Sequence, residues 1–283
     1  MTKISTRGPL VRAPRAFALA FVFTFMLVFN VGCAAVNHLR DAQDAFSNGV
    51  ALENAARLDS AETFLILAAR GSYASALQSL DQISDKQRKT LENEELWGAA
   101  LTLKALAEWR LGKYDEALST ADEAQALKEQ LFPRDAALLN ALPALVAIDL
   151  AHARIAAAES GTLEKGLAFD GGKDAAGNNV PGVKERLVGS DGKGGAVAIL
   201  ASARAMVDKD HSLQSYLILA QLAAFRNYKV AVEILTEAKF VPPDDPARVI
   251  ATKNLVDLKD IKDVKPETVR YWKDLCGLVL PQP

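Results

Sequence analysis

Apolar residues recur at helical spacing through most of this chain, and no segment alternates in the manner of a half-buried strand. Alanine is abundant, aromatic residues make up only 7% of the chain, and long segments lack Pro and Gly. Small Ala side chains let helices approach each other closely. The pattern therefore predicts an all-α fold of helix packed on helix, with essentially no sheet. The predicted helical segments are residues 36–58, 60–70, 96–111, 135–158 (kinked or restarted at Pro143), 196–207, 212–225, 249–258 and 267–278.

Three segments of the chain repeat one local pattern. Each has a Tyr three residues before an Ala, and small or apolar residues follow that Ala by four and seven positions. The Tyr and Ala pairs are Tyr73 and Ala76, Tyr114 and Ala117, and Tyr228 and Ala231. In the first two copies Gly71 and Gly112 precede the Tyr, and Gly readily adopts the left-handed conformation that ends a helix. Each copy therefore predicts a helical hairpin whose second helix begins at the Tyr.

This pattern resembles the second half of the tetratricopeptide repeat, and the second copy matches it best. The resemblance implies an α-helical solenoid of divergent repeats, whose stacked hairpins create a concave surface that binds a protein partner. The first two copies lie about 41 residues apart, whereas the family repeats every 34. In that family the first helices line the groove, so the candidate groove-lining residues are Leu106, Trp109, Arg110 and Tyr216.

Residues 160–195 interrupt the helical pattern with ten glycines. Gly disfavours a helix, so this segment is predicted to be a long loop, either disordered or binding a partner. Asp170, Asp174 and Asn178 suggest a calcium loop, but the spacing fails: Gly172 occupies the third position, Ala175 replaces the required Gly, and Pro181 stands where the bidentate Glu belongs. We therefore predict no metal site in the insertion.

The N-terminus has the pattern of a secretory leader. Four basic residues precede an apolar run at 16–29, and no acidic residue appears before Asp41. The residues that follow, ending in Gly32 and Cys33, resemble the lipobox of bacterial lipoproteins, which implies that Cys33 is acylated and becomes the new N-terminus. Asn30 stands where that family usually has Leu, so an uncleaved membrane helix and a soluble secreted form remain as alternatives.

Acylation or an uncleaved helix would each tether the body of the protein outside the cytoplasm. Ala34 follows the Cys, which by resemblance to proteobacterial sorting implies an outer-membrane lipoprotein facing the periplasm or the cell surface. The whole chain has a net charge of -2, and removal of the four basic leader residues leaves about -6. Nucleic acid is an unsuitable partner for such a chain, because its binding needs a clustered basic face. The predicted divisions are a signal peptide at 1–32, repeats at 33–159, the insertion at 160–195, and a C-terminal repeat with capping helices at 196–283.

No catalytic motif accompanies these features. His38, His152 and His211 lie in different segments, and Cys276 has no partner if Cys33 carries lipid. A zinc-protease pair and a nucleophile elbow are both missing from the sequence. We therefore expect a protein that is not an enzyme and has no cofactor. The expected function is a scaffold that assembles a protein complex in the cell envelope; the alternative is a small-ligand-binding or transporter-accessory lipoprotein.

Overall fold

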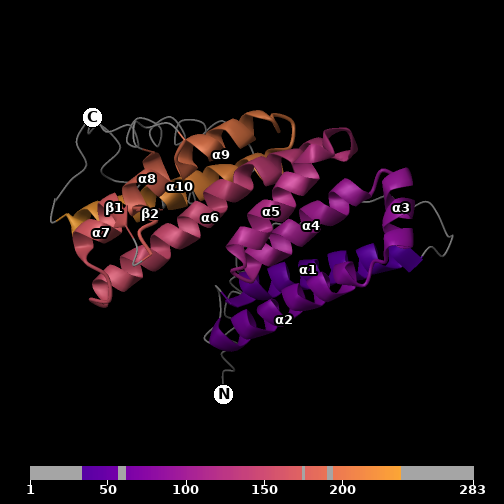
Figure 1. The fold of residues 1–283 in the computed structure, drawn as a ribbon, viewed down its shortest axis with the longest axis horizontal. Coiled ribbons are helices and arrows are strands. Elements are labelled where there is room, and N and C mark those ends of the chain that lie inside the picture. The colour runs from indigo at the N-terminus through magenta and orange to yellow at the C-terminus, as the bar shows by residue number, and fades with distance from the viewer. Residues whose placement is uncertain (1–33, 57–61, 174–175, 190–193, 237–283) are drawn as a thin grey trace, which may run out of the picture.

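The fold is a stack of antiparallel helix pairs, seen side by side in Figure 1. The structure is a computed structural model and describes residues 34–56, 62–173, 176–189 and 194–236. Helices account for 81% of these residues, which confirms the all-α prediction. Along the stack, α1 packs on α2, and this pair contacts α4, which packs on α5. α6 contacts α4 and α5 and also packs on α9 and α10.

Ten α-helices, one 3₁₀ turn and two strands make up the described residues. The first half contains α1 (Ala34–Ala56), α2 (Glu62–Asp81), α3 (Asp85–Asn93), α4 (Trp97–Arg110), α5 (Tyr114–Ala126) and the 3₁₀ turn η1 (Lys128–Gln130). The second half contains α6 (Pro133–Glu159), α7 (Lys165–Asp170), β1 (Gly171–Lys173), β2 (Asn179–Pro181), α8 (Val183–Val188), α9 (Ala196–Ala205) and α10 (His211–Leu235). The strands pair antiparallel, with Gly171 opposite Pro181, Gly172 opposite Val180 and Lys173 opposite Asn179.

Where α1 crosses α2, a large aromatic side chain packs against a glycine. Tyr73 of α2 is fully buried, and its ring centroid lies 5.2 Å from that of Phe46 on α1. One turn further along α1, a Cβ atom added to Gly49 would lie only 2.6 Å from the Tyr73 ring. The two helices approach this closely because Gly49 leaves room for the ring.

The first and third predicted hairpins are wrong, because α2 and α10 are each one continuous helix. α2 runs through Gly71, and α10 runs through Tyr228. A Gly inside a helix costs roughly 1 kcal/mol relative to Ala, which is little against the burial of Tyr73 and Ala76 on α1. The break predicted at Gly71 therefore does not form.

The second copy has the predicted helix–turn–helix. α4 ends at Arg110, Gly112 adopts a left-handed φ of 78°, and α5 begins at Tyr114. The backbone N–H of Lys113 donates to the carbonyl of Glu108 at 2.9 Å, which closes the end of α4. Ala117 is fully buried between the two helices, as its small size predicts.

The remaining predicted helices divide into those the structure describes and those it does not. Residues 36–58 correspond to α1 and 196–207 to α9, whereas 249–258 and 267–278 lie outside the described residues. α6 contains Pro143 and continues through it, so the predicted restart is wrong. Among the described residues α6 alone is long and apolar enough to cross a membrane, and half of its most apolar stretch is buried, as in the core helix of a soluble protein.

The described part of the glycine-rich insertion contains regular elements, so the prediction of a long loop is wrong. These elements are α7, the β1–β2 hairpin and α8, and the two helices pack on α6 and α10. Phe169 stacks on Tyr228 of α10 with ring centroids 6.2 Å apart, and Leu187 is fully buried. A Cβ on Gly182 would lie 2.2 Å from the carbonyl oxygen of Phe169, so this glycine permits the backbones to touch.

Alanine substitution of two helical glycines is expected to have opposite effects. Gly49→Ala should lower the free energy of unfolding by about 1–3 kcal/mol, because the new methyl group overlaps the Tyr73 ring. Gly71→Ala should raise it by about 0.5–1 kcal/mol, because the methyl group meets no atom within 4 Å and Ala favours the helix. Urea unfolding measures both, and a loss of stability in Gly71→Ala would contradict the continuous α2 helix.

A buried carboxyl group in the first turn of α6 predicts a pH-dependent stability. Asp135 is 1% exposed, its Oδ2 atom has no hydrogen bond among the described residues, and burial raises its pKa to about 6, partly offset by Arg134. The folded state therefore holds this proton more tightly than the unfolded state. Its stabilising effect is full below about pH 4 and is lost as the pH rises through 6.

Asp135→Asn should remove this dependence and stabilise the protein at pH 7 by about 1–2 kcal/mol. Urea unfolding between pH 4 and pH 8 compares the variant with the parent. Asp44→Asn, which changes an exposed carboxylate on α1, serves as the control and should follow the parent. Parallel pH profiles for the parent and Asp135→Asn would contradict the prediction.

Candidate functional site

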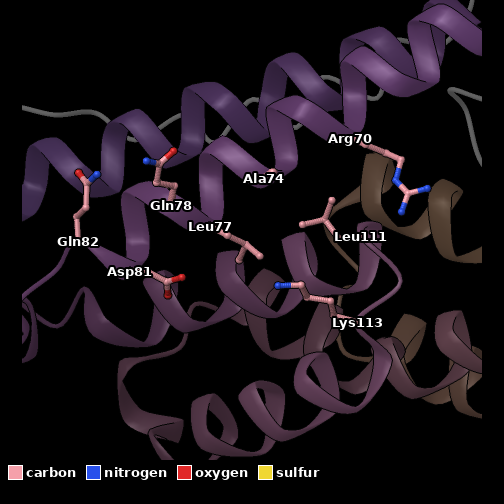
Figure 2. Close-up of a pocket in the computed structure, with 8 residues that line it drawn as sticks. All are labelled: Arg70, Ala74, Leu77, Gln78, Asp81, Gln82, Leu111 and Lys113. Carbon is pink, nitrogen blue, oxygen red and sulfur yellow. The ribbon is translucent and has the colours of Figure 1, made fainter.

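A groove runs along α2 beside the turn that joins α4 to α5, and we call it the α2 groove (Figure 2). Its volume is about 690 Å³. Figure 2 shows Leu77 of α2 and Leu111 of the turn facing the space between the two walls. The lining residues are Arg70, Ala74, Leu77, Gln78, Asp81, Gln82, Leu111 and Lys113.

The unpaired charge in the α2 groove is positive. Asp81 forms an ion pair with Lys104 at 3.0 Å, and this pair neutralises the one carboxylate among the lining residues. Within the described residues, neither Arg70 nor Lys113 makes an ion pair through its side chain. Both side chains belong to exposed residues. The groove therefore combines an apolar floor with two available cations.

Exposed apolar residues continue the groove toward the start of α2. Phe64 is 72% exposed and Leu67 is 62% exposed, with Ile66 beside them. Leu67 precedes Arg70 by three residues and Ala74 by seven, so these side chains lie on one side of the helix. We call the surface formed by Phe64, Leu67 and the α2 groove the α2 face. Large exposed apolar groups beside a groove are typical of surfaces that bind a partner.

A second feature is a polar cluster centred on Arg110, in which side chains from several helices meet. Arg110 Nη1 lies 3.2 Å from Glu53 Oε2 of α1, and its guanidinium carbon lies 4.1 Å from the centroid of the Trp109 ring. The Trp109 indole Nε1 donates a hydrogen bond of 2.7 Å to Asp149 Oδ2 of α6. We call these four residues the Arg110 cluster. It connects α1, α4 and α6 by charge-assisted contacts.

Burial and mutual charge set the ionisation of this cluster. Burial raises the pKa of Asp149, and the Trp109 hydrogen bond and Arg110 offset part of that rise. Burial also raises the pKa of the nearby Tyr73 phenol. For Arg110, burial favours the neutral form, but Tyr216 and Glu53 more than offset it and raise its pKa. The cluster thus holds one cation between two carboxylates, an arrangement suited to joining helices.

The chemistry of a catalytic or metal centre is not evident in the described residues. No group of three His, Cys, Asp or Glu side chains is placed to hold a metal ion there. In the Arg110 cluster, Glu53 forms an ion pair with Arg110, and Asp149 accepts a hydrogen bond from Trp109. The partner of Asp149 is thus an indole and not a nucleophile such as a Ser or Cys side chain.

The predicted groove-lining residues lie in the interior or at its edge. Leu106 is 2% exposed and Trp109 is 7% exposed, whereas Arg110 and Tyr216 are partly buried. Trp109, Arg110 and Tyr216 do come together at the Arg110 cluster. None of the four lines the α2 groove, and their role in binding stays a prediction. Cys33 lies outside the described residues.

Sequence reasoning did not identify the α2 groove. One signal was present, since residues 64–67 are four consecutive large apolar residues at the beginning of a helix. A core helix seldom needs apolar residues on every side in its first turn, so such a run indicates exposed apolar surface. The opposite wall, from Leu111 to Lys113, is distant from α2 in the sequence and meets it only in the folded chain.

Comparisons with protein-family models, curated proteins and solved structures return no match. What the protein does is therefore inferred from its own residues.

Removal of the indole donor in the Arg110 cluster is expected to destabilise the fold. Trp109→Phe leaves the buried Asp149 carboxylate without its hydrogen bond and should lower the free energy of unfolding by about 2–3 kcal/mol. Trp97→Phe is the matched control, because the Trp97 indole has no hydrogen-bond partner among the described residues, and it should cost distinctly less. Urea unfolding measures both variants.

A double-mutant cycle identifies the origin of this loss. In an Asp149→Asn background Trp109→Phe should cost at least about 1 kcal/mol less than in the parent, since no buried charge is then left unpaired. Equal costs in the two backgrounds would show that the hydrogen bond between Trp109 and Asp149 contributes nothing.

Proposed function

We propose that this protein is a membrane-anchored scaffold whose α2 face docks an acidic, partly apolar segment of a protein partner in the cell envelope. The observation that supports this most directly is the α2 groove with exposed Phe64 and Leu67 beside it. A chain that leaves two large apolar side chains more than half exposed next to a groove of about 690 Å³ has a surface suited to a partner.

The dimensions of the α2 face suit a protein segment better than a small molecule. From Phe64 to Asp81 the helix rises about 25 Å. An extended peptide covers that length with about eight residues. The groove is also open along its length, so a partner can lie along it without first entering a closed cavity.

The lining indicates the chemistry of the partner. Phe64 and Leu67 offer an apolar contact at one end, and Leu77 gives the groove an apolar floor. Arg70 and Lys113 suit carboxylate side chains of the partner. Amide groups on the α2 rim, from Gln78 and Gln82, can bond to the backbone of an extended segment.

Two further features support a tethered scaffold. The antiparallel pairs α1–α2 and α4–α5, followed by α6 with α9 and α10, agree with a reading as divergent helical repeats of the tetratricopeptide type. The described part of α1 starts at Ala34, the residue that follows Cys33 in the sequence. Acylation of Cys33 would therefore hold the α1–α2 pair at the membrane surface, where envelope complexes assemble.

Purification of the full-length protein from detergent-solubilised membranes tests the proposal. We expect a partner in fixed stoichiometry that is lost when the charges are reversed in Arg70→Glu/Lys113→Glu, and weakened at least about tenfold in Phe64→Ser/Leu67→Ser. An acidic, apolar segment of that partner, made as a peptide, should bind the purified parent protein directly.

Matched variants elsewhere on the surface serve as controls. Lys165→Glu reverses an exposed charge on α7, and Phe132→Ser removes another exposed large apolar side chain. Both should retain the partner, and thermal unfolding should show that all variants are folded. A partner that survives the charge reversal on the α2 face, or no stoichiometric partner, would contradict the proposal.

A further inference from the structure

A second hollow lies on the other side of the ion pair between Asp81 and Lys104, and we call it the Trp97 pocket. It has a volume of about 190 Å³ and is more enclosed than the α2 groove. Elements α2, α3, α4 and α5 all contribute to it. Its lining residues are Leu80, Arg88, Trp97, Ala100, Leu101, Lys104, Thr120 and Glu123.

The walls of the Trp97 pocket are apolar at the base and cationic at the rim. Leu80 and Leu101 are buried leucines, and Trp97 adds an aromatic ring. The Arg88 guanidinium carbon lies 4.9 Å from the centroid of that ring. Lys104 supplies a second cation from α4. This combination fits a ligand with an apolar body and a negative charge.

Arg88 is held only loosely by the carboxylate that belongs to the pocket. It pairs with Glu92 of its own helix at 2.8 Å, but Glu123 across the pocket lies 3.7 Å away. The Arg88 and Glu123 side chains are 46% and 51% exposed, and such exposed pairs contribute little to stability. A carboxylate that enters the pocket can therefore replace Glu123 beside Arg88 at small cost.

One donor of the pocket lining has no acceptor. The Trp97 indole Nε1 is buried and makes no hydrogen bond among the described residues. Buried donors in folded proteins are nearly always hydrogen-bonded, and an atom of a bound ligand is one acceptor that this indole can take. Thr120 of α5 also lines the pocket, and its hydroxyl donates a hydrogen bond of 2.7 Å to Glu108.

We propose that the Trp97 pocket binds a small aromatic carboxylate. A cavity of about 150 Å³ lined by apolar side chains is large enough for benzene, so 190 Å³ holds one aromatic ring with a carboxyl group. The ring packs between Trp97 and the leucines, and the carboxylate takes the place of Glu123 beside Arg88. This site is separate from the α2 face and does not depend on the scaffold function.

Benzoate is the probe, titrated into the full-length protein in detergent and followed by calorimetry. A ligand of this size should bind with a dissociation constant in the millimolar range. Benzyl alcohol, which has a similar shape but no charge, should bind at least about tenfold more weakly. In proton NMR the indole N–H resonance that is missing from Trp97→Phe should shift as benzoate is added.

Variants of the rim locate the carboxylate. Arg88→Gln should weaken benzoate binding about tenfold, and Lys86→Gln, an exposed change on the same helix, should leave it unchanged. Glu123→Gln should tighten binding about two- to threefold, because it removes the competing carboxylate. This second variant keeps the test decisive if Arg88→Gln does not fold.

Three results would overturn the inference. They are no saturable binding of benzoate up to roughly 20 mM, equal affinity for benzoate and benzyl alcohol, and equal affinity in Glu123→Gln and the parent. None of these outcomes bears on the α2 face, because the two sites share no lining residue and the charge-reversed variant of the α2 face retains every residue of the Trp97 pocket.

Discussion

Close approach of helices through small side chains is the constraint on which the rest of this structure depends. The clearest instance is the contact of Tyr73 with Gly49, where the aromatic ring occupies the space that any larger residue on α1 would fill. Elsewhere alanines such as Ala105 and Ala144 are fully buried in the helix contacts. Because the residues at these crossings are small, a methyl group added there overlaps the side chain opposite it, as it does with the Tyr73 ring at Gly49.

The close approach of the helices also explains the Arg110 cluster. Where the helices lie this close, the Arg110 side chain at the end of α4 reaches Glu53 on α1. The preceding residue, Trp109, reaches Asp149 on α6. Each charged group is removed from water only in part and is paired with an opposite charge or a donor, which limits the cost of burial. The aromatic and cationic residues of the cluster are thereby used to join the helix pairs, whereas Arg70 and Lys113 of the α2 groove make no ion pair among the described residues.

The sequence pattern predicted the helices correctly where local helix preference and tertiary packing agree. It was wrong where packing overrides the local preference. The α4–α5 hairpin could be predicted because Gly112 sits at a true helix end, with a φ that other residues avoid. Gly71 has the same sequence context, yet α1 covers α2 on both sides of it and the helix continues. In the insertion, composition concealed Phe169 and Leu187, whose burial orders a glycine-rich segment. The α2 groove could not be predicted, because its two walls are distant in the sequence and meet only in the folded chain.

The contact between the C-terminal half of α2 and α4 relates the two candidate binding sites. Asp81, in the last turn of that helix, lines the α2 groove, and its ion-pair partner Lys104 lines the Trp97 pocket, so the pair forms the wall between them. Both side chains are substantially exposed, and a pair of this kind is held by no more than about 1 kcal/mol. Both sites therefore depend on the packing of α4 against the C-terminal half of α2, which places Asp81 beside Lys104.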